Sequence, residues 1–323
     1  FNASIAALKG RDAVDIFILH PEGRVSEVQR RQMTSVLDPN VHNIAVRGSF
    51  DDCQNLVKAM FNNADFRNAV RLSAVNSINW ARIMAQIVYY FTSAAALGAP
   101  GRPVTFSVPT GNFGDIYAGY AAKQMGLPVD KLIVATNVND ILDRTLKSGR
   151  YEMADVTPST SPSMDIQISS NFERALFEAL DRDAAETAAA MASLRQSGAF
   201  SIPEAALTAL RGDFASARAE EGEVARMIAE TSEATGLVVD PHTACGLVAA
   251  DKVRAKNGPS GPMVTLATAH PAKFPSAVED ACGVRPALPA HLGDLLEREE
   301  RMTSLDNNQA SIEAFIAERS RAG

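Results

Sequence analysis

The sequence predicts an α/β protein in which parallel sheets are flanked by helices, and two observations carry this prediction. Short apolar runs that suit buried strands alternate with helical segments, first within residues 14–60 and again from residue 79 onward. Strand, helix and strand at this spacing are typical of a parallel sheet with crossover helices. In addition, 323 residues with 46% hydrophobic content are enough for two domains, each with a core of its own.

The first block of elements begins with a helix that ends at Gly10, a residue type typical of helix C-termini. Ser26 is a suitable N-cap for the next helix, and the apolar runs around it are the strands. The expected elements, in order, are a helix over 3–10, a strand over 14–19, a helix over 26–33, a strand over 43–46 and a helix through residue 60. We expect residues 1–72 to be the remainder of a smaller, mobile domain.

The second block is longer, and we expect residues 73–286 to form the larger domain. Its expected elements are a helix over 79–97, a strand over 104–108, a tight loop over 109–114, a helix over 115–125, a strand over 132–136, a loop over 148–171, a helix-rich stretch over 171–235, a strand over 236–240, a helix over 242–257 and a strand over 263–267. Residues 287–323 are charged, and we expect them to form a C-terminal helical tail that includes 297–301.

Composition and charge exclude several classes of protein. The net charge of −7 has the wrong sign for a dedicated nucleic-acid-binding protein. The uncharged stretch 83–101 approaches the length of a membrane span, but its polar residues and its Gly-Ala-Pro-Gly end favour a buried helix. The three cysteines, Cys53, Cys245 and Cys282, form no CxxC pair, so we expect a cytoplasmic protein without a metal site.

The segment from Ser107 to Asp115 is the strongest candidate for a ligand site. It joins a predicted strand to a predicted helix through Gly111-Asn112-Phe113-Gly114. Glycines let the backbone approach a ligand closely, and the start of a helix offers free N–H groups to a phosphate. A plain strand-to-helix turn remains the alternative, because a short glycine loop is a weak signal. The loop matches neither the Walker pattern nor the GxGxxG of dinucleotide-binding folds.

Three further segments offer polar side chains near element ends. Thr268, His270 and Lys273 follow a predicted strand, at the sheet edge where ligands bind in open α/β folds. Lys273 is a candidate for binding an anion. The alternatives are that His270 is an ordinary loop histidine and that Lys273 is an ordinary surface residue of a helix. Asn76 and Asn79 either cap the long helix or bind a substrate carboxylate or phosphate. His242 and Cys245 have a ligand-like spacing, yet no second pair accompanies them.

Long segments of this sequence resemble the threonine synthase family more closely than its cysteine synthase or serine dehydratase relatives. They stand in the family's order and extend from about Ala3 to the region of Pro286. The segments are HPEGRVSEVQRRQM from His20, NSINWARIMAQIVYYF from Asn76, SVPTGNFGDIYAGY from Ser107, NDILDRTLKSGRYE from Asn139, SPSMDIQISSNFERALFE from Ser161, DPHTACG from Asp240 and LATAHPAKF from Leu266.

The resemblance implies a fold-type II, tryptophan synthase beta-like enzyme that uses pyridoxal 5′-phosphate (PLP). Such an enzyme converts O-phosphohomoserine and water into threonine and phosphate, and we expect it as a monomer or homodimer. The resemblance implies that Thr268 faces the pyridine nitrogen. We nominate Asn76, Asn79, Arg82 and Lys273 for the substrate. The cup for the cofactor phosphate would be formed by Gly111, Asn112, Phe113, Gly114 and Asp115.

The sequence departs from the family at its start. The family's Schiff-base lysine, and its Ser-Gly-Asp-Thr-Gly loop for the substrate carboxylate, correspond to positions before Phe1, and Lys9, Lys58 and Lys147 lie outside that lysine motif. We therefore expect that the N-terminal part is missing and that this chain alone makes no threonine.

A non-catalytic relative that binds a phosphorylated ligand and another fold-type II PLP lyase remain alternatives. A nucleotide-binding α/β protein is disfavoured by the absent glycine signatures.

Overall fold

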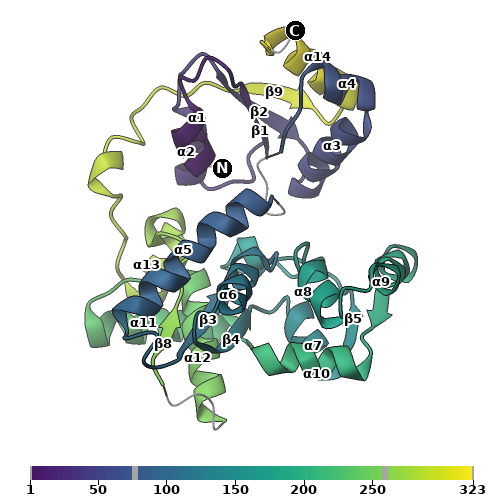
Figure 1. Ribbon diagram of the computed structural model, residues 1–323. Coiled ribbons are helices and arrows are strands. Elements are labelled where there is room, and N and C mark those ends of the chain that lie inside the picture. The colour runs from purple at the N-terminus through teal and green to yellow at the C-terminus, as the bar shows by residue number, and fades with distance from the viewer. Residues whose placement is uncertain (1, 75–78, 257–260, 322–323) are drawn as a thin grey trace. The chain divides into compact units, whose positions relative to one another are not determined.

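The computed structural model describes residues 2–74, 79–256 and 261–321, and the chain forms two compact units (Figure 1). One unit combines Phe1–Val75 with Ala287–Gly323, and the other comprises Asn76–Pro286. Each unit has its own parallel sheet with helices packed against it. The predicted α/β fold with parallel sheets flanked by helices is therefore confirmed.

The smaller unit is built on a three-stranded sheet. Its described elements are α1 (Asn2–Leu8), β1 (Ile16–Pro21), α2 (Glu27–Thr34), β2 (Val41–Arg47), α3 (Phe50–Asn62), α4 (Ala64–Ala69), the short 3-10 helix η3 (Ala290–Leu292), β9 (Thr303–Asp306) and α14 (Gln309–Arg319). The strand order is β1-β2-β9, and both pairings are parallel. Leu56 of α3 and Ile312 of α14 pack with Ile44 of β2, whereas Met33 of α2 packs with Ile18 of β1. The sheet therefore has an apolar core on both faces.

The C-terminal segment differs from the predicted helical tail. Residues 297–301 form a turn and irregular backbone rather than a helix, and β9 then pairs with β2. The Glu300 carboxylate accepts hydrogen bonds from Arg30 Nε at 2.9 Å and from Thr34 Oγ1 at 2.6 Å. The hydrogen bond from Arg30 is the main reason that the pKa of Glu300 falls to about 2. This ion pair and the strand pairing attach the segment to the smaller unit.

His20 in β1 makes the stability of the smaller unit sensitive to acid. Its side chain is buried, neither ring nitrogen has a hydrogen-bond partner among the described residues, and burial lowers the pKa of the ring. The Pro21 backbone opposes this shift most strongly, Arg30 lowers the pKa further, and Glu22 and Glu300 also oppose the shift. Because the unfolded chain binds the proton more readily, we expect stability to fall as the pH drops below about 6.5, by at most about 1.4 kcal/mol per pH unit.

Melting curves recorded by circular dichroism between pH 7.5 and pH 5 test this expectation. His20→Leu should lose less stability over this range than the wild-type protein, since it has no proton to bind. His291, which lies on the short helix η3 and is exposed, provides the control, because His291→Leu should follow the wild-type pH dependence. Equal acid sensitivity of His20→Leu and the wild type would show that His20 does not carry the effect.

The larger unit contains a four-stranded parallel sheet in the order β7-β4-β3-β8, drawn from β3 (Val104–Pro109), β4 (Val129–Thr136), β7 (Phe214–Arg218) and β8 (Met263–Thr265). A separate antiparallel pair consists of β5 (Arg150–Glu152) and β6 (Ala199–Ser201). The described helices are α5 (Trp80–Ala96), α6 (Gly114–Gln124), α7 (Ile141–Ser148), η1 (Pro162–Met164), α8 (Phe172–Ala179), α9 (Ala184–Ser197), α10 (Glu204–Asp213), α11 (Glu221–Thr235), α12 (Pro241–Ala255), η2 (Pro271–Lys273) and α13 (Pro275–Cys282).

Helices cover both faces of this sheet. On one face, α5, α6, α8 and α10 enclose the main core, which includes Tyr90, Phe106 and Phe113. On the other face, α12 packs against the sheet through Ala249, and α11 and α13 pack beside it. The side chains of β3 are buried along its whole length. Because β3 and β8 are parallel neighbours, their carboxyl ends lie at the same edge of the sheet, where a ligand site is expected.

One predicted strand of this unit was wrong, and three strands were missed: β5 in the predicted loop over 148–171, and β6 and β7 in the predicted helix-rich stretch over 171–235. Residues 236–240 form no strand: Leu237 is 65% exposed, and Asp240 caps α12. The edge strand beside β4 is β7. It follows α10 directly and lies inside the stretch that we predicted to be helical. β7 is short and rich in alanine, so its strand character depends on its parallel pairing with β4 rather than on local propensity.

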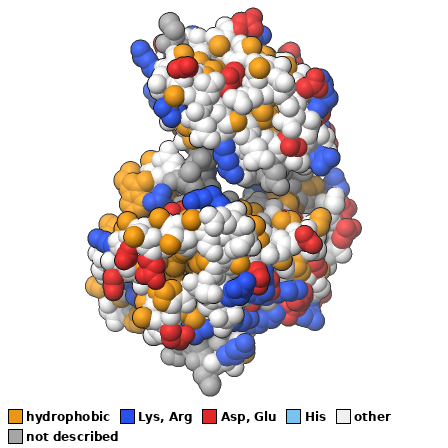
Figure 2. Space-filling model, turned by 90° about the vertical axis from the view of Figure 1, so that its right-hand side faces the viewer, with side chains coloured by type: hydrophobic (Ala, Val, Ile, Leu, Met, Phe, Trp, Pro, Cys, Tyr) orange, Lys and Arg blue, Asp and Glu red, His pale blue; other side chains and the backbone are white. Residues whose placement is uncertain are grey.

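The surface in Figure 2 carries Lys and Arg side chains interspersed with Asp and Glu side chains, and scattered hydrophobic side chains lie between them. Such mixing is ordinary for a folded protein. None of the helices in the described ranges is both long enough and apolar enough to traverse a bilayer.

Candidate functional site

The candidate site begins at the loop between β3 and α6. Phe113 occupies the left-handed region with φ 61°, and its side chain is buried against Phe172 and Phe214. This conformation turns the chain sharply into α6, whose first turn receives no side-chain cap. Within the described part of the chain, the N–H groups of Gly111, Asn112 and Phe113 donate to no protein acceptor. They are therefore available to a bound anion.

The carbonyl groups of the same loop are held from the other side. Gly111 O accepts from Ser169 Oγ at 2.7 Å, and Asn112 O accepts from the backbone N–H of Asn171 at 3.0 Å and from its Nδ2 at 2.9 Å. Ser169 is itself held by Tyr151, whose hydroxyl oxygen accepts from the Ser169 N–H at 2.8 Å. These bonds fix the loop with its carbonyl groups paired and its N–H groups open, an arrangement that suits a phosphate.

Gly111 has no space for a side chain. A Cβ atom at this position would lie 2.8 Å from the carbonyl oxygen of Ser163, which belongs to η1. Because the neighbouring atom is backbone, it cannot turn away as a flexible side chain could. The close approach of η1 to the loop therefore requires glycine at position 111.

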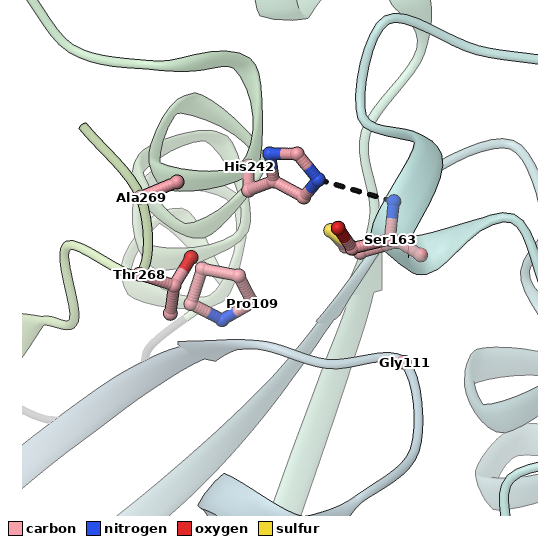
Figure 3. A pocket seen from close by; sticks show the side chains of 7 residues that line it. Pro109, Gly111, Ser163, His242, Thr268 and Ala269 are labelled. Carbon is pink, nitrogen blue, oxygen red and sulfur yellow. Dashed lines mark hydrogen bonds between the residues drawn. The ribbon is translucent and has the colours of Figure 1, made fainter. Parts of the chain in front are cut away.

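A pocket lies over this loop (Figure 3). Thr268 contributes to it from the chain just after β8, and Gly111 contributes from the chain just after β3. Two of the sequence-predicted site residues thus meet in one pocket, because β3 and β8 are parallel neighbours. The pocket is lined by Pro109, Gly111, Ser163, Met164, His242, Thr268 and Ala269.

Asp115 does not direct its carboxyl group to the phosphate loop. The Asp115 carboxylate accepts hydrogen bonds from the hydroxyl groups of Tyr89 and Tyr90 on α5, the latter at 3.2 Å. Burial raises the pKa of Asp115, and the two tyrosine hydrogen bonds oppose this shift. The Asp115 side chain therefore joins α6 to α5, and only its backbone N–H belongs to the start of α6. Likewise, the side chain of Phe113 lies in the core, so its contribution to the loop is its backbone.

Of the residues nominated for the substrate, the three that the structure describes, Asn79, Arg82 and Lys273, are not among those that line this pocket. Asn79 caps α5, since its side-chain oxygen accepts from the Ala81 N–H at 2.9 Å. Arg82 is exposed on α5, and Lys273 ends η2 five residues after Thr268. Asn76 lies outside the described residues. Their roles toward substrate stay predictions.

The sequence did not single out His242 as a residue of this site, except as one half of an improbable metal pair. Its ring lies in the pocket wall, where Nε2 accepts from the Ser163 N–H at 3.2 Å (Figure 3). The chain also contains Cys245 nearby, and burial raises the pKa of its thiol to about 12. Among the described residues, no group of three His, Cys, Asp or Glu side chains is placed to hold a metal ion.

Comparison with known proteins gives the same family as the sequence motifs. The family model for pyridoxal-phosphate-dependent enzymes matches residues 2–219, and the model for the C-terminal part of threonine synthase matches residues 243–316. The threonine synthase of Pseudomonas aeruginosa is 54% identical over 323 residues, which are 100% of this chain and 68% of that protein. That of Corynebacterium glutamicum is 40% identical over 97% of this chain and 66% of its own length.

Solved structures agree with these matches. A PLP-bound threonine synthase from Brucella melitensis has a TM-score of 0.94 at 58% identity and covers 99% of this chain and 68% of its own. Yeast threonine synthase has a TM-score of 0.90 at 40% identity, over 98% of this chain and 67% of its own. This chain thus spans about two thirds of the length of these relatives. It belongs to the threonine synthase family of pyridoxal-phosphate-dependent enzymes.

Proposed function

We propose that the larger unit binds the phosphate and pyridine parts of PLP, and that the protein uses it to convert O-phosphohomoserine and water into threonine and phosphate. The observation that carries the proposal is the loop Gly111–Phe113, whose N–H groups donate to no acceptor among the described residues and whose first residue, Gly111, lines one pocket with Thr268. Similarity to a threonine synthase over the whole of this chain, which is 68% of that protein, supports the choice of reaction. It also disfavours a non-catalytic relative or a different PLP lyase.

The described residues fit this cofactor. The loop offers N–H donors at the start of an eleven-residue helix, α6, which suits a dianionic phosphate. Thr268 lines the same pocket and would offer a neutral hydroxyl to the pyridine nitrogen. When bound, PLP supplies the electron sink for the reaction, and the protein supplies binding and orientation.

The remaining steps need groups that hold the leaving phosphate and move protons. Arg82 and Lys273 remain our candidates for the leaving phosphate, because it needs cationic partners. The pocket lining of the described residues contains no lysine, so we assign no proton-transfer role to the lysines of this chain. A mobile smaller unit, a monomeric or homodimeric state and a cytoplasmic location also stay predictions.

An assay of the protein purified from its own source, with PLP and O-phosphohomoserine, tests the proposed reaction. We expect threonine and inorganic phosphate in equal amounts, and no 2-oxo acid when serine or threonine is supplied instead. Formation of 2-oxo acids without threonine would indicate a different PLP lyase. Assaying the 323-residue chain in parallel tests the expectation that it makes no threonine by itself.

A further inference from the structure

His242 lies at the start of α12, lines the pocket and contacts Asp240, Ser163 and Phe274. Its side chain is buried, Nδ1 lies 2.7 Å from Asp240 Oδ2, and Nε2 lies 3.2 Å from the backbone nitrogen of Ser163. The ring also packs against Phe274, with ring centroids 4.7 Å apart. Phe274 directly follows η2, in the segment that begins with Thr268. One imidazole thus contacts Ser163 in the pocket lining and Phe274 in the segment that follows Thr268.

The hydrogen bonds determine the state of this ring. A backbone N–H can only donate, so Nε2 must present its lone pair to Ser163. Nδ1 then carries the proton and donates it to Asp240. Burial acts to raise the pKa of Asp240, but hydrogen bonds from His242 and Thr243 outweigh it, so the pKa falls below its usual value. An ionised, buried Asp240 therefore holds a neutral imidazole in one orientation.

The bond from Ser163 reaches the phosphate loop through one further contact. Ser163 donates its N–H to His242, and its carbonyl oxygen lies against Gly111, 2.8 Å from the place of a Cβ atom. The position of η1 therefore decides how much space remains over the loop. Asp165 directly follows η1 in the sequence. Its carboxylate accepts hydrogen bonds from the side-chain amides of Asn137 and Asn139 at 2.8 and 2.9 Å.

Capping of α12 does not need the imidazole. Asp240 accepts from the backbone N–H groups of His242 and Thr243 at 3.0 and 3.1 Å, and it would do so with many residue types at position 242. The ring, in contrast, supplies the only acceptor that the Ser163 N–H has among the described residues. The bond to Ser163 is thus a separate feature from the helix cap.

We propose that His242 is a positioning residue of the cofactor site: as a neutral acceptor for the Ser163 N–H, it sets the position of η1 over the phosphate loop. This inference rests on the proposed PLP site and goes beyond it, because His242 acts through Ser163. It predicts that an acceptor at the place of Nε2 matters for ligand affinity, and that the aromatic ring as such matters less.

Two substitutions separate the acceptor from the ring. In His242→Gln, the side-chain oxygen can reach the place of Nε2 and accept from Ser163. In His242→Asn, the amide can still donate to Asp240 but is too short to reach Ser163. Both lose the packing against Phe274. Thr243→Val is the matched control, because it removes a hydroxyl donor to Asp240 in the same cap without touching the bond to Ser163.

The probe is pyridoxine 5′-phosphate, which has the phosphate and the ring but no aldehyde, so its binding needs no lysine. Its dissociation constant is measured by calorimetry, alongside the melting temperature without ligand. We expect His242→Asn to weaken binding about tenfold and His242→Gln to stay within about threefold of the wild type. Thr243→Val should lower the melting temperature and leave the dissociation constant unchanged.

Equal dissociation constants for His242→Asn and His242→Gln, whether near the wild-type value or far from it, would overturn the role of the acceptor. So would a loss of affinity in all three variants that follows their melting temperatures, because this would indicate general loosening of the α12 cap. A wild-type protein that does not bind pyridoxine 5′-phosphate at all would instead contradict the proposed cofactor site. The two failures are therefore distinguishable.

Discussion

Replacing Gly111 by valine is expected to weaken binding of pyridoxine 5′-phosphate by about a hundredfold or more. The new Cβ atom would meet the Ser163 carbonyl oxygen at 2.8 Å, so either the loop or η1 must move. Movement of the loop would misalign at least two N–H donors to the phosphate, and hydrogen bonds to charged groups are worth about 1.5–3 kcal/mol each. Losing two of them corresponds to about a hundredfold or more in affinity.

Calorimetric titration of the Gly111→Val protein measures this effect, and its melting temperature shows whether it is folded. Gly222→Val is a suitable control, because a Cβ atom added to Gly222 in α11 would meet no neighbouring atom within 4 Å. The control should bind the probe as the wild type does. Unchanged affinity in Gly111→Val would remove the loop from the cofactor site.

Replacing Gly119 by alanine or valine is expected to cause a large loss of stability in the larger unit. A Cβ atom at Gly119 in α6 would lie 2.6 Å from Tyr90 Cε1 and 2.8 Å from Leu132 Cδ2. Tyr90 cannot easily turn aside, since its hydroxyl donates to Asp115 O at 2.9 Å. Overpacking of this kind costs about 1–3 kcal/mol for one added carbon, and valine adds two more.

Urea unfolding followed by the fluorescence of Trp80 measures this loss, because the chain's single tryptophan lies in the larger unit. Gly212→Ala in α10, where an added Cβ meets nothing within 4 Å, should be neutral or stabilising by about 0.5–1 kcal/mol. If Gly119→Ala were as stable as Gly212→Ala, close packing of α6 on α5 and β4 would not limit this position.

Most of the fold could be predicted because its central strands carry their own signal. β1, β2, β3 and β4 are apolar, β-branched runs that read as buried strands without any knowledge of their partners. β7 and β9 lack such runs. Each is a strand because a neighbour pairs with it, β4 in one case and β2 in the other. A local pattern cannot reveal a pairing partner that lies far away in the sequence.

The same reason explains which parts of the site could be predicted. Gly111 and Thr268 follow predicted strands, so the sheet-edge rule applied to them, and the structure brings them to one pocket. Ser163 comes from an irregular stretch, and His242 meets it only through a contact across 79 residues. Asp115 is one of the residues predicted for the phosphate cup, and the pattern says nothing of its carboxylate, whose partners are tyrosines on the preceding helix, α5. Motifs identify residues near a site better than they predict where each side chain points.

A crystal structure of the protein with bound pyridoxine 5′-phosphate tests the central claim most directly. We predict that the phosphate oxygens lie within about 3.2 Å of the backbone nitrogens of Gly111, Asn112 and Phe113, and that the pyridine nitrogen lies at a similar distance from the Thr268 hydroxyl. A phosphate bound away from this loop, or a ring whose nitrogen points away from Thr268, would contradict the site.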